Sequence, residues 1–259
     1  MTDTTILSLH ELSLSIAGRR LCHQLSLRLP AGQCLGILGQ NGTGKTTLLH
    51  TLMRLREPDA GRIELNQRAL AQWSREELAT HLGILFQNSH DAMPATVLEI
   101  ALMGRHPHLA NWQWEGNEDI AMAREALAAL GIAGLEKRDI QSLSGGERQR
   151  LAIATLLTQR PRLFLLDEPG NHLDIAFQVQ SLQLLRSHVQ THNAALCMAT
   201  HDINLAARYC DQIMLLTGDG ECVMGTAAEV LTSNNLSHAY GCEIRSVSTD
   251  DGRQIFFPA

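Results

Sequence analysis

The chain has 259 residues, of which 44% are hydrophobic and 19% charged, and its formal net charge is −6. This length allows one large domain or a core with a subdomain, and the composition is that of an ordinary globular protein. The acidic balance argues against a nucleic-acid-binding surface, and the six scattered cysteines form no zinc or disulfide pattern. No apolar run approaches the ~18 residues that span a bilayer, so we expect any work at a membrane to require a partner.

The first fifty residues predict a hairpin, a strand and a helix. Apolar residues alternate with polar ones over residues 12–16 and again over residues 25–29, with Ala17 and Gly18 between the two runs. This pattern predicts an antiparallel hairpin. The apolar run at 34–38 is typical of a buried strand, and residues 45–53 of a helix.

A glycine-rich loop between that strand and that helix predicts a nucleotide site. Residues 39–46 fit G-x-x-x-x-G-K-[ST], in which backbone N–H groups and the helix N-terminus converge on phosphate oxygens. Lys45 would reach the β- and γ-phosphates, and the Thr46 hydroxyl would hold Mg²⁺. We therefore expect ATP and Mg²⁺ as cofactors. The residues predicted to bind the nucleotide here are Gly39, Gln40, Asn41, Gly42, Thr43, Gly44, Lys45, Thr46 and Thr47.

The rest of the chain alternates between strands and helices, except for one helical stretch. Residues 95–160 predict helices and no clear strand. The layout predicts an α/β fold: a P-loop NTPase core with an N-terminal antiparallel β hairpin region and a helical subdomain insertion. We place the core at 1–87 and 161–259, and the helical subdomain at 88–160. Further expected elements are a turn at 58–61, strands at 62–65, 82–86, 163–166, 194–199 and 212–216, and helices capped by Ser74 with Glu77 and by Thr226 with Glu229.

Two carboxylates follow the apolar strand at 163–166. Ligands bind at the carboxyl ends of parallel strands, so Asp167 would help to hold Mg²⁺. Glu168 would polarise the attacking water as a general base. A strand that simply ends in an acidic turn is the alternative, and the phosphate loop earlier in the chain argues against it.

A second anion-binding helix end is predicted at residues 143–149. Ser144 and Glu147 form a capping box, and Gly145 and Gly146 leave the first N–H groups of the helix uncovered. By spacing alone, a well-capped helix without a ligand is the simpler interpretation.

Residues 143–149, Leu-Ser-Gly-Gly-Glu-Arg-Gln, look like the signature motif of the ATP-binding cassette (ABC) ATPases. The order of the other motifs is similar to that family over essentially the whole chain. Gln87 matches its Q-loop glutamine, residues 167–169 its second nucleotide motif, residues 171–174 its D-loop, and His201 its switch histidine.

This resemblance implies a head-to-tail dimer in which ATP is sandwiched between two copies. Ser144, Gly145 and Gly146 of one copy would close on the γ-phosphate held by the phosphate loop of the other, and Asp174 would lie at the interface. His201 would contact the γ-phosphate and help to position water. Gln87 would sense the γ-phosphate and contribute to catalysis and to the Mg²⁺ site.

Three positions depart from the family pattern. Gly170 stands where Thr or Ser is usual, which would loosen the D-loop. Ile16 stands where an aromatic residue usually stacks on adenine, so we expect weak discrimination between ATP and GTP. Gln40 replaces a common Pro, and we expect no effect of that change.

Residues 97–107 are similar to the start of the helical subdomain in importers of iron–siderophores, haem and cobalamin, and residues 207–211 and 251–257 agree. The resemblance implies a motor subunit at the cytoplasmic face of the plasma membrane. It would dock peripherally on a permease dimer that receives cargo from a periplasmic or surface binding protein, with no nucleic-acid partner. Nearby, His106 and His108 suggest either a metal site or a polar loop, and Trp112 and Trp114 either loop packing or contact with the membrane partner.

Two alternatives remain open for the whole protein. One is the motor of an exporter or of a lipoprotein-releasing system. The other is a soluble cassette ATPase that acts on DNA or ribosomes, a class that usually carries a long coiled-coil insertion or two cassettes, whereas this chain has one phosphate loop.

Overall fold

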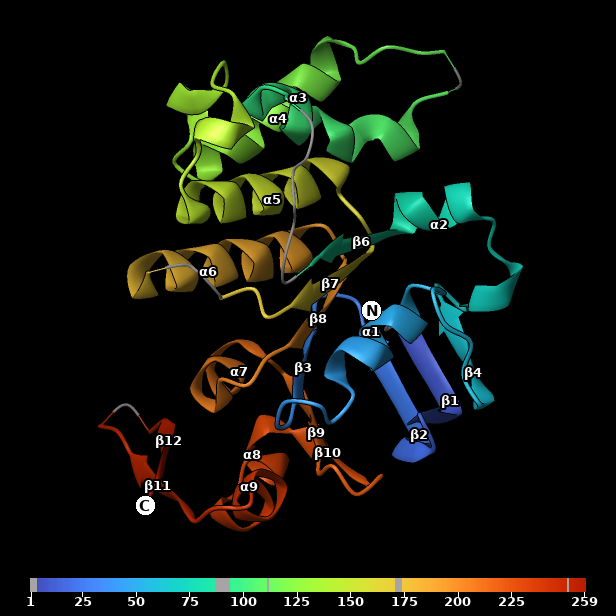
Figure 1. Cartoon of the computed structure of the whole chain (residues 1–259), viewed down its shortest axis with the longest axis vertical. Helices are drawn as coiled ribbons and strands as arrows, with labels where there is room; N and C mark the ends of the chain where they lie inside the picture. The colour runs from blue at the N-terminus through green and yellow to red at the C-terminus, as the bar shows by residue number, and fades with distance from the viewer. Residues whose placement is uncertain (1–3, 87–93, 111, 171–173, 251) are drawn as a thin grey trace. The chain divides into compact units, whose positions relative to one another are not determined.

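The computed structural model describes residues 4–86, 94–110, 112–170, 174–250 and 252–259 (Figure 1). The chain divides into two compact units, Met1–Trp73 with Val189–Ala259, and Ser74–His188. The boundaries at residues 88 and 160 that the sequence suggests for a helical subdomain stay a prediction.

The first unit contains an antiparallel sheet that begins with the predicted hairpin. Its strand order is β2-β1-β4-β5. Leu7 pairs with Leu29 and Leu9 with Leu27, so the alternating apolar side chains of the two long strands are buried together. The strands are β1 (Thr5–Ile16), β2 (Arg19–Pro30), β4 (Ala60–Leu65) and β5 (Arg68–Ala69).

The same unit holds a mostly parallel run of strands in the order β10-β9-β3-β8. Strand β3 (Cys34–Leu38) lies between β8 (Ala195–Ala199) and β9 (Gln212–Leu216) and is parallel to both, and β10 (Cys222–Thr226) pairs with β9 antiparallel. Every residue of β3 and β8 is buried, which explains their continuous apolar sequences. The phosphate loop follows the carboxyl end of β3.

Short helices and a terminal hairpin complete this unit. Asn204 exchanges two hydrogen bonds with the backbone of Phe256, at 2.9 and 3.0 Å, and so holds the terminal hairpin against helix α7. The sequence did not predict this hairpin. The elements are α1 (Lys45–Leu52), η1 (Leu70–Gln72), α7 (Ile203–Tyr209), α8 (Ala227–Val230), α9 (Ser233–Tyr240), β11 (Ile244–Ser248) and β12 (Gln254–Pro258).

The second unit contains two parallel strands and the predicted helical stretch. Strand β6 (Leu82–Leu85) pairs with β7 (Leu163–Asp167), and the capping box of Ser74 and Glu77 begins helix α2 as predicted. Within the described part of 95–160 the structure has helices and a single isolated bridge. The helices of this unit are α2 (Arg75–His81), α3 (Val97–Leu102), η2 (Met103–His108), α4 (Asn117–Ala129), η3 (Ala133–Leu135), η4 (Ile140–Ser142), α5 (Gly145–Gln159) and the greater part of α6 (Ile175–Thr191).

Helices α3 and α4 both pack against α5 (Figure 1). Helix α5 is the longest of these three and begins at the predicted signature motif. In the part of the chain that the structure describes, no helix is long and apolar enough to cross a membrane.

Candidate nucleotide-binding site

The loop between β3 and α1 has the backbone of a phosphate-binding loop. Gly44 has a φ of 107°, a left-handed conformation that glycine adopts without strain. A Cβ on Gly44 would lie 2.8 Å from the side chain of Leu21, so the packing of the loop on strand β2 also requires glycine here. No side chain caps α1 and no acidic residue lies in its first turn. Its N-terminus is therefore suited to an anion.

Lys45 lies across this loop. Its side chain is 7% exposed, and Nζ donates to the carbonyl oxygens of Gly39 (2.7 Å) and Gln40 (3.1 Å). The Thr43 hydroxyl donates to the same Gln40 oxygen at 2.9 Å. The ammonium charge is thus fixed at the loop, while Thr46 in the first turn of α1 is exposed. This arrangement fits the phosphate chain of a nucleotide.

Asp167 is the last residue of strand β7 in the second unit, and Glu168 follows it directly; they are 5% and 7% exposed. Burying carboxylates costs free energy unless positive charge or hydrogen bonds compensate. Glu168 has a φ of 52°, which is uncommon outside glycine and concentrates at functional sites. Carboxylate and hydroxyl oxygens are ligands that Mg²⁺ takes, so Asp167 and Thr46 fit this metal chemically.

The predicted capping box at the signature motif is present. The Ser144 hydroxyl accepts from the Glu147 N–H (3.3 Å), and the Ser144 N–H donates to the Glu147 carboxylate (2.8 Å). This second bond, reinforced by the Ser144 hydroxyl, holds the pKa of Glu147 below its ordinary value. A Cβ on Gly145 would meet no atom within 4 Å, so the helix end is open at this residue.

The remaining candidates lie in both units. His201 follows strand β8, and the backbone of the preceding Thr200 bonds to Ile37 of β3 at 3.1 Å. The structure therefore brings His201 and the phosphate loop to the same edge of the sheet. Asp174 in the second unit accepts from the Phe177 N–H at 2.8 Å and begins helix α6.

In the second unit, the Gln149 amide donates to the carbonyl oxygen of Pro169 at 3.3 Å. The signature helix and the segment after Glu168 are therefore in direct contact. Gln87 and residues 171–173 of the predicted D-loop lie outside the described residues. The catalytic and binding roles of all these side chains stay predictions.

Two contacts of the phosphate loop were not predicted from the sequence. Arg19, at the start of β2, donates to the carbonyl oxygens of Gly218 (2.6 Å) and Gly42 (3.4 Å). The Gln40 amide donates to the carbonyl oxygen of Tyr240 in α9. Both join residues far apart in the chain, and no local pattern indicates them.

The positions that depart from the family pattern have defined surroundings. A Cβ on Gly170 would lie 1.8 Å from the Gln178 amide nitrogen, so Thr or Ser at 170 would require Gln178 to move. Ile16, at the end of β1, is 43% exposed.

The loop after η2 corrects one expectation. Trp112 and Trp114 are 100% and 87% exposed, so the interpretation that they pack the loop is wrong. His106 lies 3.3 Å from the Glu115 carboxylate, and His108 is hydrogen-bonded to the carbonyl oxygen of Gln159 at 2.8 Å. The two histidines thus have separate protein partners.

Comparison with known proteins gives one family. The family model described as ABC transporter matches residues 22–171. The chain is 40% identical over 245 residues to the hemin import ATP-binding protein HmuV of Escherichia coli O157:H7, covering 92% of this chain and 93% of that protein. It is 34% identical over 242 residues to the iron(3+)-hydroxamate import ATP-binding protein FhuC of Bacillus subtilis (strain 168), covering 93% and 90%. A solved structure of a metal-chelate type ABC transporter in an inward-facing conformation matches with a TM-score of 0.85 at 30% identity, over 99% of this chain and 98% of that one.

Proposed function

The chain belongs to the ABC transporter family, and from this membership we propose that it is the ATP-hydrolysing motor of a membrane importer for haem or an iron–siderophore. The fold is that of the ABC ATPases, a P-loop core with an antiparallel sheet and a helical insertion. The observation that carries the proposal is the near full-length likeness to proteins named for hemin and iron(3+)-hydroxamate import. Cobalamin, the third cargo, is supported only by the sequence resemblance of residues 97–107, 207–211 and 251–257.

The side chains of both units supply the chemistry of ATP hydrolysis. The loop amides and Lys45 bind and orient the phosphates, and the geometry of the loop supports this role. Thr46 and Asp167, with Gln87 as a further candidate, would hold Mg²⁺, which neutralises charge on the phosphates when bound. Glu168 takes a proton from the attacking water, and His201 helps to orient that water.

Two copies would pair head to tail. Ser144, Gly145 and Gly146 of one copy then face the nucleotide on the loop of the other, with Asp174 at the interface. The open helix end at Gly145 supports this arrangement, since N–H groups there can meet a γ-phosphate. Closing on ATP and opening after hydrolysis would supply the mechanical step.

A permease dimer in the plasma membrane would receive this motion at its cytoplasmic face, while a periplasmic or surface binding protein delivers the cargo. The names of the relatives, which are ATP-binding subunits of import systems, support this assignment. They do not favour an exporter motor or a DNA- or ribosome-directed ATPase.

Reconstitution tests the proposal. The protein would be co-purified with the permease encoded beside it and placed in proteoliposomes with ATP. Labelled hemin, a ferric hydroxamate and cobalamin would then be offered in parallel. We expect ATP-dependent accumulation of one iron chelate, abolished by Lys45→Ala. ATP-dependent export, or no association with any permease, would contradict the importer assignment.

A further inference from the structure

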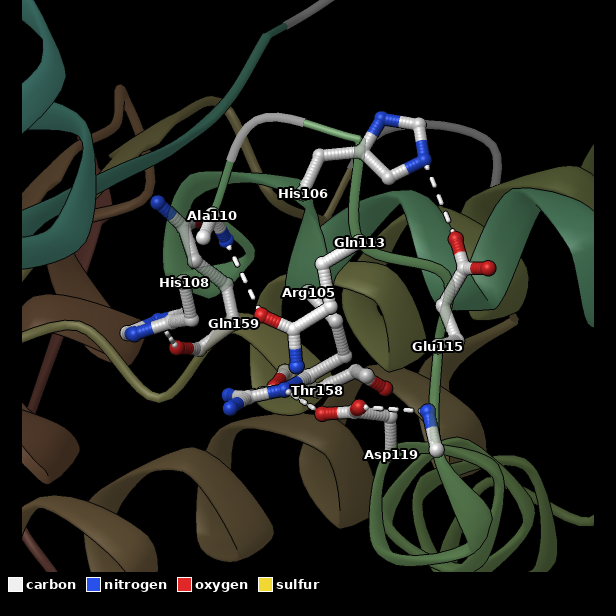
Figure 2. A network of polar contacts seen from close by, with 10 residues as sticks. Arg105, His106, His108, Ala110, Gln113, Glu115, Asp119, Thr158 and Gln159 are labelled. Carbon is white, nitrogen blue, oxygen red and sulfur yellow. Dashed lines mark hydrogen bonds and ion pairs between the residues drawn. The ribbon is translucent and has the colours of Figure 1, made fainter.

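The C-terminal end of the signature helix α5 is held by side chains from several segments of the second unit. Arg105 lies between Asp119 and Thr158, and His108 lies beside Gln159 (Figure 2). Thr158 and Gln159 are the last two residues of α5.

The pair of Arg105 and Asp119 is the centre of this cluster. Arg105 Nε donates to Asp119 Oδ1 at 2.7 Å, and the two side chains are only 13% and 14% exposed. Arg105 Nη1 also donates to the carbonyl oxygen of Thr158 at 3.2 Å. The other oxygen of Asp119 accepts from the Gly116 N–H at 2.9 Å. The guanidinium therefore joins the start of α4 to the end of α5.

Two further contacts fix the last residue of the helix. The His108 ring is 2.8 Å from the carbonyl oxygen of Gln159, where its Nε2–H donates. The Gln159 amide nitrogen donates to the carbonyl oxygens of Ala79 (2.7 Å) and Leu82 (3.0 Å), which belong to α2 and β6. The end of α5 is thereby tied to the strand that leads toward Gln87.

The backbone of Gly104 in η2 packs closely against the backbone of α5. A Cβ there would lie 2.3 Å from the carbonyl oxygen of Thr155 and 2.9 Å from the Gln159 nitrogen. Segment η2 therefore lies directly on the last turn of α5. We call Arg105, His108, Asp119 and Gln159 the α5 clamp.

Because a helix is rigid, a clamp at the C-terminal end of α5 also fixes the position of the signature motif at its N-terminal end. Helix α5 has 15 residues, about 22 Å of rigid rod, and Ser144 precedes its first residue. A tilt of about 10° about the clamped end would move the first turn by roughly 4 Å. Hydrogen bonds tolerate only a few tenths of an ångström, so contacts to a γ-phosphate would be lost.

Stability alone is a weak reason to bury such a pair. Well-packed apolar side chains often stabilise a fold as well as a buried ion pair does. A guanidinium with two directed bonds instead fixes angle and distance.

We propose that Arg105 is a positioning residue for ATP hydrolysis, which through the α5 clamp sets the angle at which Ser144 and Gly146 meet the nucleotide held by a second copy. This role rests on the proposed ATPase function and deepens it. None of the four clamp residues is among those proposed to bind the nucleotide within the same copy, so we expect loss of the clamp to leave nucleotide binding to a single copy unchanged.

The test uses the full chain with Arg105→Gln, Arg105→Lys and His108→Ala. His108 is exposed, so its replacement keeps the fold. The control is Arg124→Ala, which removes an exposed pair with Glu136 in the same unit. Each variant is measured well below its thermal midpoint for three quantities: affinity for a fluorescent ATP analogue, kcat and KM for ATP, and ATP-dependent dimer formation with Glu168→Gln added.

We expect Arg105→Gln to keep its nucleotide affinity within twofold, to lose at least tenfold in kcat and to form no ATP-dependent dimer. Arg105→Lys keeps the charge but not the two-pronged geometry, so its kcat should lie between those of wild type and Arg105→Gln. His108→Ala should lose less kcat than Arg105→Gln. Hydrolysis within twofold of wild type in both Arg105 variants would overturn the role. So would an equal loss of nucleotide affinity, which would indicate general unfolding. A wild-type protein that binds no ATP would overturn the proposed function itself.

Discussion

Lys45 and Glu168 illustrate how single residues are prepared for chemistry. Lys45 is buried with its ammonium bonded to backbone carbonyl oxygens of its own loop, so the charge lies where phosphates would bind. Glu168 is buried in a left-handed conformation directly after strand β7. Both burial and a positive φ cost a glutamate free energy, so its surroundings must stabilise it in this conformation. Such strained residues concentrate at functional sites.

Lys45→Ala should nearly abolish ATP hydrolysis. Removing one cation that stabilises the charge of the transition state typically lowers the rate by ~10²–10³. Phosphate release by the purified protein measures the effect, and Lys137→Ala, which removes an exposed lysine, is the control. Hydrolysis by Lys45→Ala at the wild-type rate would exclude this lysine from the mechanism.

Glu168→Gln should keep ATP bound and stall hydrolysis. The amide has the shape of the carboxylate but cannot take a proton from water, and it removes one negative charge from a site for a polyanion. Size-exclusion chromatography with Mg²⁺ and ATP should show a stable dimer of the variant and a mainly monomeric wild type. A variant that stays monomeric with ATP would argue against the sandwich arrangement.

At the scale of elements, helix ends are defined by capping residues that repeat the same chemistry. Thr96 with Glu99, Ser144 with Glu147 and Thr226 with Glu229 each exchange hydrogen bonds across one turn. In each case the backbone N–H of the capping residue bonds to the glutamate and keeps the pKa of that carboxyl low. Acidic conditions should therefore weaken several helix starts together.

The acid sensitivity of the second unit should depend on Asp119. Its hydrogen bond from Arg105, followed by the one from the Gly116 N–H, lowers its pKa in the folded state. A depressed pKa stabilises the fold above the unfolded value of about 3.9, and this contribution is lost as the pH falls through the lower folded value. Asp119→Asn should thus be less stable near neutral pH and less sensitive to acid below about pH 4.

Urea unfolding between about pH 3 and pH 7 measures this difference across that window. Glu118→Gln, which replaces an exposed carboxylate in the same helical turn, is the matched control. Parallel curves for wild type and Asp119→Asn would show that the clamp carboxylate does not contribute.

At the scale of the whole molecule, most of the cysteines are part of the hydrophobic core. Cys22, Cys34, Cys197 and Cys210 are buried, and Cys242 is exposed. Burial raises the pKa of Cys22 to about 11 and also raises that of Cys197. The thiolate is the reactive form of cysteine, and these two residues carry almost none of it at neutral pH.

Labelling with a thiol-reactive disulfide at about pH 7.5 should therefore modify Cys242 quickly and the buried thiols only as the protein unfolds. Cys242→Ser should remove the fast phase, and urea should accelerate the slow one in step with unfolding. A fast-reacting thiol that persists after both Cys242 and the half-buried Cys222 are replaced by Ser would indicate that the first unit opens under native conditions.

The sequence by itself determined the structural features that depend only on residues close together in the chain. The phosphate loop, the capping boxes and the hairpin of residues 5–30 are short patterns whose geometry is set by glycine conformations, by spacings of three residues and by strand alternation. The order of these patterns was enough to assign the fold and the family. Such features need no knowledge of distant segments.

Only the tertiary structure decided which distant residues meet. Arg105 contacts Asp119 and Thr158, 14 and 53 positions away, and Gln159 contacts Ala79, 80 positions away. Arg19 reaches Gly218 across 199 positions. These partners are selected by tertiary packing, which brings each polar group within reach of acceptors from distant segments. No local pattern carries that information, because the selecting surface exists only after the chain has folded.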